Sequence, residues 1–367
     1  MDAEKKIKLL VLIPNLRCGG SEKYVTLLCN NINTDKFDTT LVVLDNSTPF
    51  YIINTPAIEI IDLKIKRVRR SLFAIKRIVK EKQPDIIFSV SNHLNLYLAI
   101  YRWLFSKKIK LLAQESSIAS INNRRAASPK LYSWLMKKFY RRIDCIICQS
   151  EYLQQDLIKN FNINRGKTIV IHNPVEEMAA DHLRPAANNN SSRIFKFITV
   201  ARLSEEKGID RLIRAIAELK VPFQYYIIGE GDKKENLQHL INQLNLQDKV
   251  FLTGEKNEPY IGMEDADLAL MGSHYEGFPN VLLEAGALGI PVIAYDAPGG
   301  IKEIIIEEEN GLLIKEGDEK AFAAAIEKAL QIKFDKDKII AASKKRFSTG
   351  TIIAQVEKLL LDLSYQH

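Results

Sequence analysis

The chain has 367 residues, which is too long for one ordinary hydrophobic core, so two domains are expected. Its 46% hydrophobic and 26% charged residues are typical of a soluble globular protein, and no segment is expected to span a membrane. The net charge of +7 raises nucleic acid as a partner, but no nucleic-acid-binding motif accompanies it, so nucleic acid is not expected to bind.

The first half begins with a buried strand predicted at Ile7–Pro14 and a helix from Gly20. The lysines before this strand imitate a secretory signal, but the apolar run Leu9–Ile13 is too short, and Asn15 and Arg17 follow at once. The protein is therefore expected in the cytoplasm, as a peripheral protein on the inner face of the plasma membrane.

The same alternation of apolar strands and helices continues through the first half. Further elements are predicted as strands at Thr39–Leu44, Ile58–Leu63, Asp85–Val90, Ile109–Ser116, Asp144–Ser150 and Thr168–His172, and as a helix near Ser71–Lys82. Because strands separated by helices form parallel sheets, the pattern of the first half predicts one parallel sheet flanked by helices.

Basic residues gather in the first half. Residues 1–175 contain 29 Lys and Arg against 14 Asp and Glu, whereas the remainder contains 23 against 31. Two stretches, Lys64–Lys82 and Arg124–Arg142, hold much of the excess, and the second interleaves its cations with Tyr132, Trp134 and Phe139. This pattern predicts contact with an anionic membrane surface. A solvated helix face whose aromatic side chains lie in the core is the alternative.

The second half repeats the alternation after a polar stretch, Ala179–Ser192, which we interpret as a linker or an exposed loop. Its strands are predicted at Phe195–Ala201, Gln224–Ile228, Lys249–Thr253, Leu268–Met271 and Pro291–Tyr295. The domains are therefore predicted at residues 1–175 and 176–349, each with its own parallel sheet.

Arg202 and Lys207 follow the first strand of the second half, and Gly208 leads into a helix with a clear apolar stripe. Ligands of open α/β sheets bind at the carboxyl ends of the strands. An Arg fork and a Lys point charge supply the positive charge that a diphosphate needs. Two unrelated surface cations are the alternative interpretation.

Glu276 and Glu284 bracket a Gly-Phe-Pro turn and an apolar run. Pro279 is well placed as the first residue of a helix, whose initial amides form a ready site for a phosphate. Glu284 would then lie roughly 7.5 Å further along the axis at 1.5 Å per residue. This layout suits a ligand with a central diphosphate and hydroxyl-rich groups at both ends, such as a nucleotide sugar. Two solvated acids on an amphipathic helix are the alternative.

Two metal-like motifs are discounted. Cys145 and Cys148 have metal or redox spacing, but they lie in a strand-like run, so reduced buried thiols are expected. Asp265 and Asp267 form an Asp-x-Asp pair, but the sequence leads directly from them into a strand. Arg202 and Lys207 already offer the charge that a metal would bring, so no metal or other cofactor is expected.

The sequence resembles the group-1 retaining glycosyltransferases with the GT-B fold, glycosyltransferase family 4, of the type that builds bacterial surface polysaccharides such as lipopolysaccharide and capsule. Segments spread over nearly the whole chain carry this resemblance: Gly19-Gly20-Ser21-Glu22, Ile171-His-Asn-Pro174, Arg202 with Lys207-Gly208, Ile228-Gly-Glu-Gly231, Glu276 to Glu284, and Asn310-Gly-Leu-Leu-Ile314. The resemblance implies two Rossmann-like domains facing a cleft, an acceptor-side first domain and a second domain that binds the donor. It also implies that a final helix, within residues 350–367, packs back on the first domain.

The resemblance implies a role for each matching residue. Arg202 and Lys207 would offset charge on the leaving diphosphate, Glu284 would hold the ribose, and Glu276 would contact the transferred sugar and its anomeric centre. The remaining residues expected at the donor are the phosphate-side Gly19, Gly20, Gly277, Phe278, Asn280 and Val281, and the base-side Gly254 and Glu255.

One position departs from the family pattern. Many relatives carry a His at the end of the first-domain strand that faces the donor sugar, where this chain has Glu115. Its carboxylate would orient the sugar or take a proton from the acceptor. His93 is a second acceptor-side candidate, with a structural role at a helix start as the alternative.

The expected activity is the metal-independent transfer of a sugar, of the hexosyl type, from a nucleotide-diphosphate donor. The donor is expected to be UDP-linked, and the acceptor a lipid-linked or saccharide molecule of cell-surface polysaccharide synthesis. Two alternatives stay open, a nucleotide-sugar epimerase and a non-catalytic nucleotide-sugar-binding protein.

Overall fold

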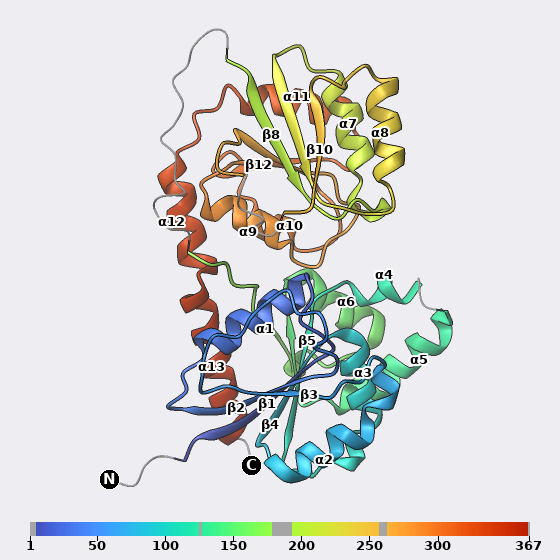
Figure 1. Ribbon diagram of the computed structural model, residues 1–367, viewed down its shortest axis with the longest axis vertical. Helices are drawn as coiled ribbons and strands as arrows, with labels where there is room; N and C mark the ends of the chain where they lie inside the picture. Colours follow the sequence, from blue (N-terminus) through green and yellow to red (C-terminus); the bar gives the residue numbers. More distant parts are fainter. Residues whose placement is uncertain (1–4, 125–126, 178–192, 257–262, 366–367) are drawn as a thin grey trace. The chain divides into compact units, whose positions relative to one another are not determined.

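A computed structural model describes residues 5–124, 127–177, 193–256 and 263–365. The expected linker at 179–192 lies outside these residues. The chain divides into two compact units: unit 1 is Met1–Pro174 with Thr349–His367, and unit 2 is Val175–Ser348. Both junctions lie one residue before the predicted boundaries, and each unit is shown within Figure 1.

Unit 1 contains a parallel sheet whose strands, among the described residues, have the order β3-β2-β1-β4-β5-β6-β7. These strands are β1 (Ile7–Ile13), β2 (Phe37–Val43), β3 (Glu59–Asp62), β4 (Ile86–Val90), β5 (Lys110–Glu115), β6 (Cys145–Cys148) and β7 (Thr168–Val170). The chain leaves β1 for β2 on one side and continues through β4 on the other. This topological switch point lies between β1 and β4.

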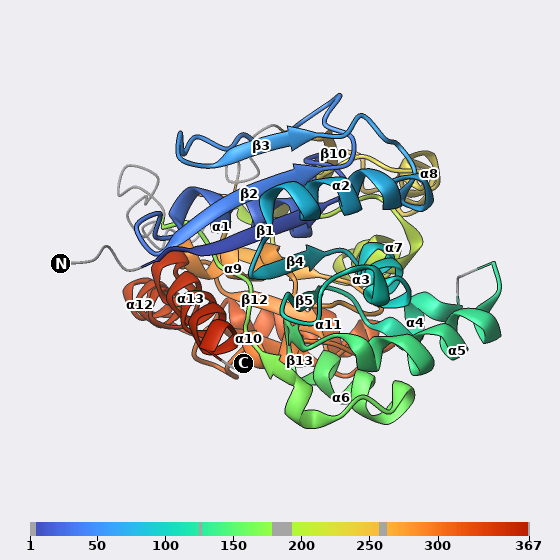
Figure 2. The same ribbon diagram turned by 90° about the horizontal axis from the view of Figure 1, so that it is seen from below.

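Helices cover both faces of the unit 1 sheet. They are α1 (Gly20–Asn31), α2 (Leu72–Lys82), α3 (Asn92–Ile100), α4 (Ala119–Arg124), α5 (Pro129–Phe139), α6 (Glu151–Phe161) and α13 (Thr349–Tyr365), with short 3-10 turns η1 (Val68–Arg70), η2 (Arg102–Leu104), η3 (Tyr140–Arg142) and η4 (Arg165–Lys167). Figure 2 shows α1 and α13 on one face and α2, α3 and α5 on the other.

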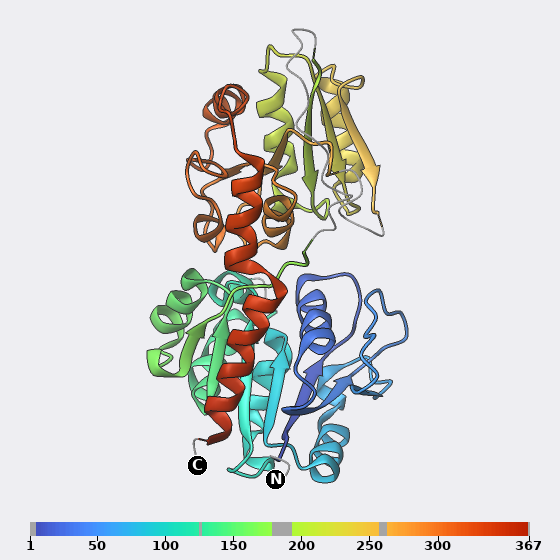
Figure 3. The same cartoon turned by 90° about the vertical axis from the view of Figure 1, so that its left-hand side faces the viewer.

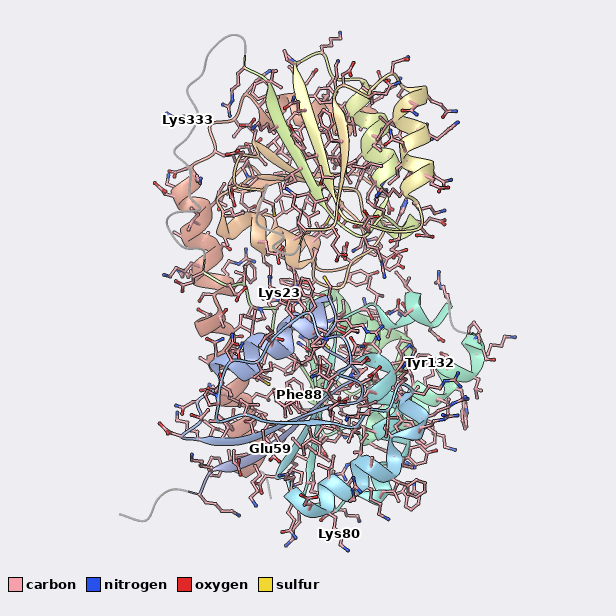
Figure 4. The ribbon with its side chains drawn as sticks, in the orientation of Figure 1. Lys23, Glu59, Lys80, Phe88, Tyr132 and Lys333 are labelled. Carbon is pink, nitrogen blue, oxygen red and sulfur yellow. The ribbon has the colours of Figure 1, made fainter. Side chains whose placement is uncertain are left out.

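Apolar side chains of α1 and α13 join the strand residues in one core. Tyr24 of α1 packs edge-on against Phe88 of β4, whose ring lies inside the unit (Figure 4). Ile352, Val356 and Leu360 of α13 are buried in the same cluster, and Figure 3 shows this last red helix running along the unit. The final helix therefore packs on unit 1, as the family resemblance implies.

Unit 2 contains a second parallel sheet, with the order β10-β9-β8-β11-β12-β13 among its described residues. The strands are β8 (Phe195–Val200), β9 (Phe223–Ile228), β10 (Val250–Gly254), β11 (Leu268–Met271), β12 (Val292–Tyr295) and β13 (Gly311–Ile314). The chain leaves β8 for β9 on one side and reaches β11 on the other. The switch point of this sheet therefore lies between β8 and β11.

Two helical layers enclose the unit 2 sheet. The helices are η6 (Glu205–Lys207), α7 (Ile209–Ala217), α8 (Lys234–Gln243), α9 (Asn280–Ala287), α10 (Ile301–Ile304), α11 (Glu319–Ala329) and α12 (Lys336–Phe347). One core cluster joins the sheet to α7, α8 and α11, and the other joins it to α9, α10 and the end of α12.

The sequence predicts the parallel sheets correctly but not every boundary. Several predicted strands run one or two residues too far at their carboxyl ends; Ser150, for example, is the N-cap of α6 and accepts a hydrogen bond from Leu153 N at 3.2 Å. The strand β13 is missing from the predicted set. Its four residues begin at Gly311, directly after the turn that ends at Asn310, and are too few to show a strand period.

Candidate functional site

Three loops of unit 2 meet at the carboxyl edge of its sheet, beside the switch point between β8 and β11. They are residues 201–208 after β8, 272–279 after β11 and 296–300 after β12. In open α/β sheets this is the position at which ligands bind. Arg202, Lys207 and Glu276 all lie on these loops.

Lys207 and Glu276 are in direct contact although 69 residues separate them in the chain. The Lys207 ammonium lies 2.6 Å from Glu276 Oε1, and Ser273 Oγ donates to the same oxygen at 2.6 Å. The Glu276 side chain is only 11% exposed and that of Lys207 23%. The carboxylate is therefore fixed by a cation and a hydroxyl, with limited access to water.

Arg202 lies on the same loop but is held differently. Its guanidinium donates to Glu206 Oε1 at 2.8 Å, and Ser204 Oγ donates to the same atom at 2.8 Å. Burial raises the pKa of Glu206, but its hydrogen bonds to backbone and Ser204 and the charge of Arg202 together hold that pKa below its ordinary value. The Arg202 side chain is 69% exposed, so this contact adds little stability and leaves the fork accessible.

The loop after β12 fixes the backbone of Glu276. Glu276 N donates to Pro298 O, and Gly300 N donates to Gly277 O, both at 2.9 Å. Gly299 has a φ of +129°, and a Cβ there would overlap the Glu276 carbonyl oxygen. Only glycine allows this approach. Sequence reasoning missed Ser273, Pro298 and Gly299, because only their contacts across three loops connect them with Glu276.

The helix start differs by one residue from the prediction. Pro279 occupies the N-cap with extended backbone (φ −74°, ψ 111°), so α9 begins at Asn280 rather than at Pro279. A proline at the cap still fits the start of a helix, whose first amides have no partner within the helix. Glu284 lies one turn into α9 and is 6% exposed.

The other donor-side residues occupy distinct environments. Phe278 is buried and packs edge-on against Phe347, so its side chain belongs to the core. Asn280 and Val281 are partly exposed in the first turn of α9. Gly254 ends β10 with a φ of +77° and accepts from Gly229 N at 2.9 Å, while Glu255 beside it is exposed.

In unit 1, residues after β1, β4 and β5 gather at the corresponding edge. Gly19 is the N-cap of α1 and Gly20 its first residue. Ser21 Oγ donates to Ser116 Oγ at 3.1 Å, which ties the start of α1 to the loop after β5. His93 is the second residue of α3, is exposed, and packs edge-on against the Tyr132 ring.

Glu115 is fully buried within unit 1. Its Oε1 accepts hydrogen bonds from the Tyr140 hydroxyl and from Asn95 Nδ2, the latter at 3.3 Å. Burial raises the pKa of Glu115 to about 7, although the bonds from Tyr140 and Asn95 act in the opposite direction. The carboxyl is engaged in the interior, so its expected contact with the donor sugar or the acceptor stays a prediction that the burial disfavours.

This buried carboxyl gives unit 1 a defined dependence on pH. Unfolded Glu115 ionises near pH 4.5 and folded Glu115 near pH 7, so the folded state binds the extra proton and stability is lost as pH rises through this window. Replacing Glu115 by Gln keeps a carbonyl acceptor and removes the titration. We expect the variant to exceed the parent in unfolding free energy at pH 8 by up to ~3 kcal/mol, with little difference at pH 4.5.

Urea denaturation at pH 4.5, 6 and 8 measures this effect, and Glu81→Gln on the exposed face of α2 is the matched control. A Glu115→Gln variant whose stability falls between pH 4.5 and pH 8 as steeply as the parent's would contradict the assignment.

The residues of the two discounted metal motifs occupy structural positions. Cys145 and Cys148 are buried in β6 as free thiols, and burial raises the pKa of Cys145 to about 11 and that of Cys148 further. Asp267 pairs with Arg193 and accepts from Lys196 N at 2.8 Å. Asp265 and Asp267 precede β11, so they lie at the edge of the sheet opposite Lys207 and Glu276.

Unit 1 presents large exposed hydrophobic side chains, most of them aromatic, among its basic residues. Phe73 of α2, Trp103 of η2, and Leu131 and Trp134 of α5 expose more than half of their surface. The Lys138 ammonium lies 4.6 Å from the Trp134 ring centroid. Tyr140, by contrast, is in the core, so the aromatic residues of this segment divide between the membrane-surface and core interpretations.

The helices that carry these side chains are neighbours on one face of the sheet. Tyr97 of α3 donates to Arg69 O at 3.0 Å, which joins α3 to the turn before α2, and the His93–Tyr132 contact joins α3 to α5. In Figure 4, Lys80 projects outward from α2, and Tyr132 lies on α5. In the described part of the chain, no helix has the length and apolar character needed to cross a bilayer.

Two family models match the chain. "Glycosyl transferases group 1" matches residues 183–346, and "Glycosyltransferase Family 4" matches residues 18–177. The chain is 29% identical over 358 residues to the N-acetylgalactosamine-N,N'-diacetylbacillosaminyl-diphospho-undecaprenol 4-alpha-N-acetylgalactosaminyltransferase of Campylobacter jejuni, covering 93% of this chain and 94% of that protein. It is 27% identical to the lipopolysaccharide 1,6-galactosyltransferase of Escherichia coli, covering 77% and 76%.

Solved structures share the fold at low sequence identity. Sucrose-phosphate synthase of Thermosynechococcus elongatus has a TM-score of 0.83 at 20% identity and covers 98% of this chain and 99% of its own. HepE of Anabaena in complex with UDP-glucose has a TM-score of 0.78 at 20% identity, with 97% and 100% covered. With one parallel α/β sheet in each unit, the chain belongs to the group-1 glycosyltransferases of GT-B fold.

Proposed function

We propose that this glycosyltransferase moves a hexosyl-type sugar, with retention of configuration, from a UDP-linked donor to a lipid-linked or saccharide acceptor in cell-surface polysaccharide synthesis. The observation that carries the proposal is the Lys207–Ser273–Glu276 cluster at the switch point of the unit 2 sheet. Relatives named for undecaprenol-linked and lipopolysaccharide acceptors support the acceptor class, and the UDP-glucose complex of HepE supports the donor class.

In the proposed chemistry, the bond between the sugar's anomeric carbon and the diphosphate breaks, and charged side chains of the site stabilise the charge that develops on each side of it. Lys207 and the accessible fork of Arg202 offset the negative charge that develops on the leaving diphosphate. Glu276, held by Lys207 and Ser273, contacts sugar hydroxyls and the positive anomeric centre. Glu284 takes the ribose, Gly254 and Glu255 take the base, and Gly19 and Gly20, which carry no side chain, are proposed as phosphate-side residues.

We propose that this chemistry needs no divalent metal. The Asp265–Asp267 pair precedes β11, whereas Lys207 and Glu276 follow strands of the same parallel sheet, so the two sets lie at opposite edges. Asp267 is also engaged with Arg193 and with the backbone of Lys196. The positive charge at the diphosphate then comes from the protein alone.

Release of UDP from a panel of UDP-sugars, with and without EDTA, tests the proposal. We expect one donor to release UDP slowly in the presence of EDTA, and Glu276→Gln to lower this turnover by ~10²-fold or more while leaving a measurable rate. Glu218→Gln at the exposed far end of α7 should retain it. No turnover of any donor would contradict the function, and loss of turnover in EDTA would contradict the metal-independent chemistry. A free sugar nucleotide as product would instead indicate the epimerase.

We further propose that unit 1 binds the anionic inner face of the plasma membrane, with the enzyme otherwise in the cytoplasm. Phe73, Trp103, Leu131 and Trp134 would enter the headgroup boundary while the neighbouring Lys and Arg contact anionic lipid. Each such cation contributes about 1 kcal/mol of attraction near the surface.

Cosedimentation with phosphatidylglycerol vesicles measures this binding. Changing Phe73, Trp103 and Trp134 together to Ser is expected to weaken it ~10-fold or more, because each interfacial aromatic contributes apolar burial. Ile194→Ser in unit 2, also more than half exposed, is the control. Equal vesicle binding by the parent, the triple variant and Ile194→Ser would argue against these side chains of unit 1 as the membrane-binding surface.

A further inference from the structure

We propose that Arg211 is a positioning residue for Glu276. Arg211 lies on α7, four residues after Lys207 in the chain. It lies outside every motif that the sequence analysis connects with the donor. The inference deepens the proposed function, because it concerns how the same site holds its carboxylate.

Arg211 clamps the backbone of the loop after β11. Its Nε donates to Gly272 O at 2.6 Å, and its Nη2 donates to Ser273 O at 2.6 Å. The two carbonyls belong to adjacent residues, so the planar fork fixes both peptide orientations at once. Ser273 also donates its side-chain hydroxyl to Glu276, which lies three residues further on.

The guanidinium is itself held on its remaining sides. Its Cζ lies 4.0 Å from the centroid of the Tyr295 ring, and Nη1 lies 3.5 Å from Glu316 Oε1. The side chain is 7% exposed, and its desolvation lowers the pKa of Arg211 against the opposing influence of Tyr295 and Glu316. Burying a charge in this way is costly unless its donors are engaged, which accounts for the fixed geometry.

The consequence reaches Glu276 through a short, stiff path. The loop is bonded to its neighbours at two further positions, since His274 N donates to Glu206 O and Glu276 N donates to Pro298 O, each at 2.9 Å. Arg211 fixes the two residues that precede these bonds. Without the fork, Ser273 can turn away from Glu276, leaving the carboxylate with Lys207 alone.

Arg211→Met is the primary variant, Arg211→Lys keeps the charge without the fork, and Arg214→Met on the exposed face of the same helix is the control. Amide hydrogen exchange at residues 273–276 is measured on the full-length protein. We expect exchange ~10-fold faster or more in both Arg211 variants at these amides only, with Arg214→Met equal to the parent. Unchanged exchange there, or an equal increase across all of unit 2, would overturn the positioning role.

A double-mutant cycle on donor turnover provides the second readout. Arg211→Met should lower kcat ~10²-fold, because small displacements of a positioned group have such effects. The Kd of UDP, measured by calorimetry, should change less than ~3-fold, and in a Glu276→Gln background the further loss should also stay below ~3-fold. Additive losses would overturn the proposal. If the parent turns over no UDP-sugar, the proposed function fails, and amide exchange alone decides the role of Arg211.

Discussion

Replacing Lys207 by Ala is expected to lower kcat/KM for the UDP-sugar donor by about 10²–10³-fold, the usual effect of removing one group that stabilises charge in a transition state. Lys207 follows β8 at the switch point, and its ammonium lies 2.6 Å from Glu276. Its loss therefore removes the positive charge that would offset the negative charge of the leaving diphosphate. The same change leaves the Glu276 carboxylate with Ser273 as its remaining partner among the side-chain contacts described above.

Lys220→Ala, at an exposed position just beyond α7, is the matched control and should retain parental turnover. Lys207→Arg should recover only part of the activity, because the wider fork cannot reproduce the point charge of an ammonium. Turnover of Lys207→Ala within ~3-fold of the parent would show that the Lys207–Glu276 pair is structural, since one catalytic contact of this kind has a much larger effect.

The second large effect is expected at Gly208, where two loops of the site meet backbone to backbone. Gly208 has a φ of +53°, and a Cβ there would overlap the carbonyl oxygen of Gly272. A Cβ on Gly272 would in turn approach the carbonyl of Gly208. Because backbone lies on both sides, neither partner can yield by changing a rotamer.

Gly208→Ala is therefore expected to lower the unfolding free energy of unit 2 by ~3 kcal/mol, from left-handed strain together with the steric overlap. Each kcal/mol corresponds to roughly 2–4 °C in Tm for a domain of this size. Gly317→Ala is the control, since Gly317 also has a positive φ, +82°, but faces open space. The unfolding free energy of Gly317→Ala should fall only by the smaller contribution from left-handed strain. An equal fall in unfolding free energy in the two variants would contradict the role of the close backbone approach between Gly208 and Gly272.

The architecture could be predicted from the sequence because its signals are local. Apolar runs separated by helical periods predict parallel sheets, and both sheets are parallel in the structure. Lys207 and Glu276 could be connected for the same reason, since the carboxyl ends of parallel strands meet at one edge of a sheet.

The support of the site could not be predicted, because it depends on tertiary contacts between distant loops. Arg211 occupies an ordinary helical position, and nothing nearby indicates that its fork reaches Gly272 and Ser273, more than sixty residues away in the chain. Gly299 resembles any loop glycine until the Glu276 carbonyl is placed beside it.

The burial of the Glu115 side chain could not be predicted from the sequence for a different reason. Strands of a parallel sheet that is covered on both faces show no alternation of polar and apolar residues, so the sequence does not reveal the direction of one side chain. The structure shows that this side chain lies under α3 and η3, against Asn95 and Tyr140.

The central claim is that the Lys207–Ser273–Glu276 cluster of unit 2 receives the diphosphate and sugar of the donor. A crystal structure of the protein in complex with UDP tests it most directly. We predict a phosphate oxygen within hydrogen-bonding distance of Lys207 Nζ, with the diphosphate at the start of α9. UDP bound elsewhere, for example in the hollow between α7 and α8 lined by Arg214, Lys233 and His239, would contradict the claim.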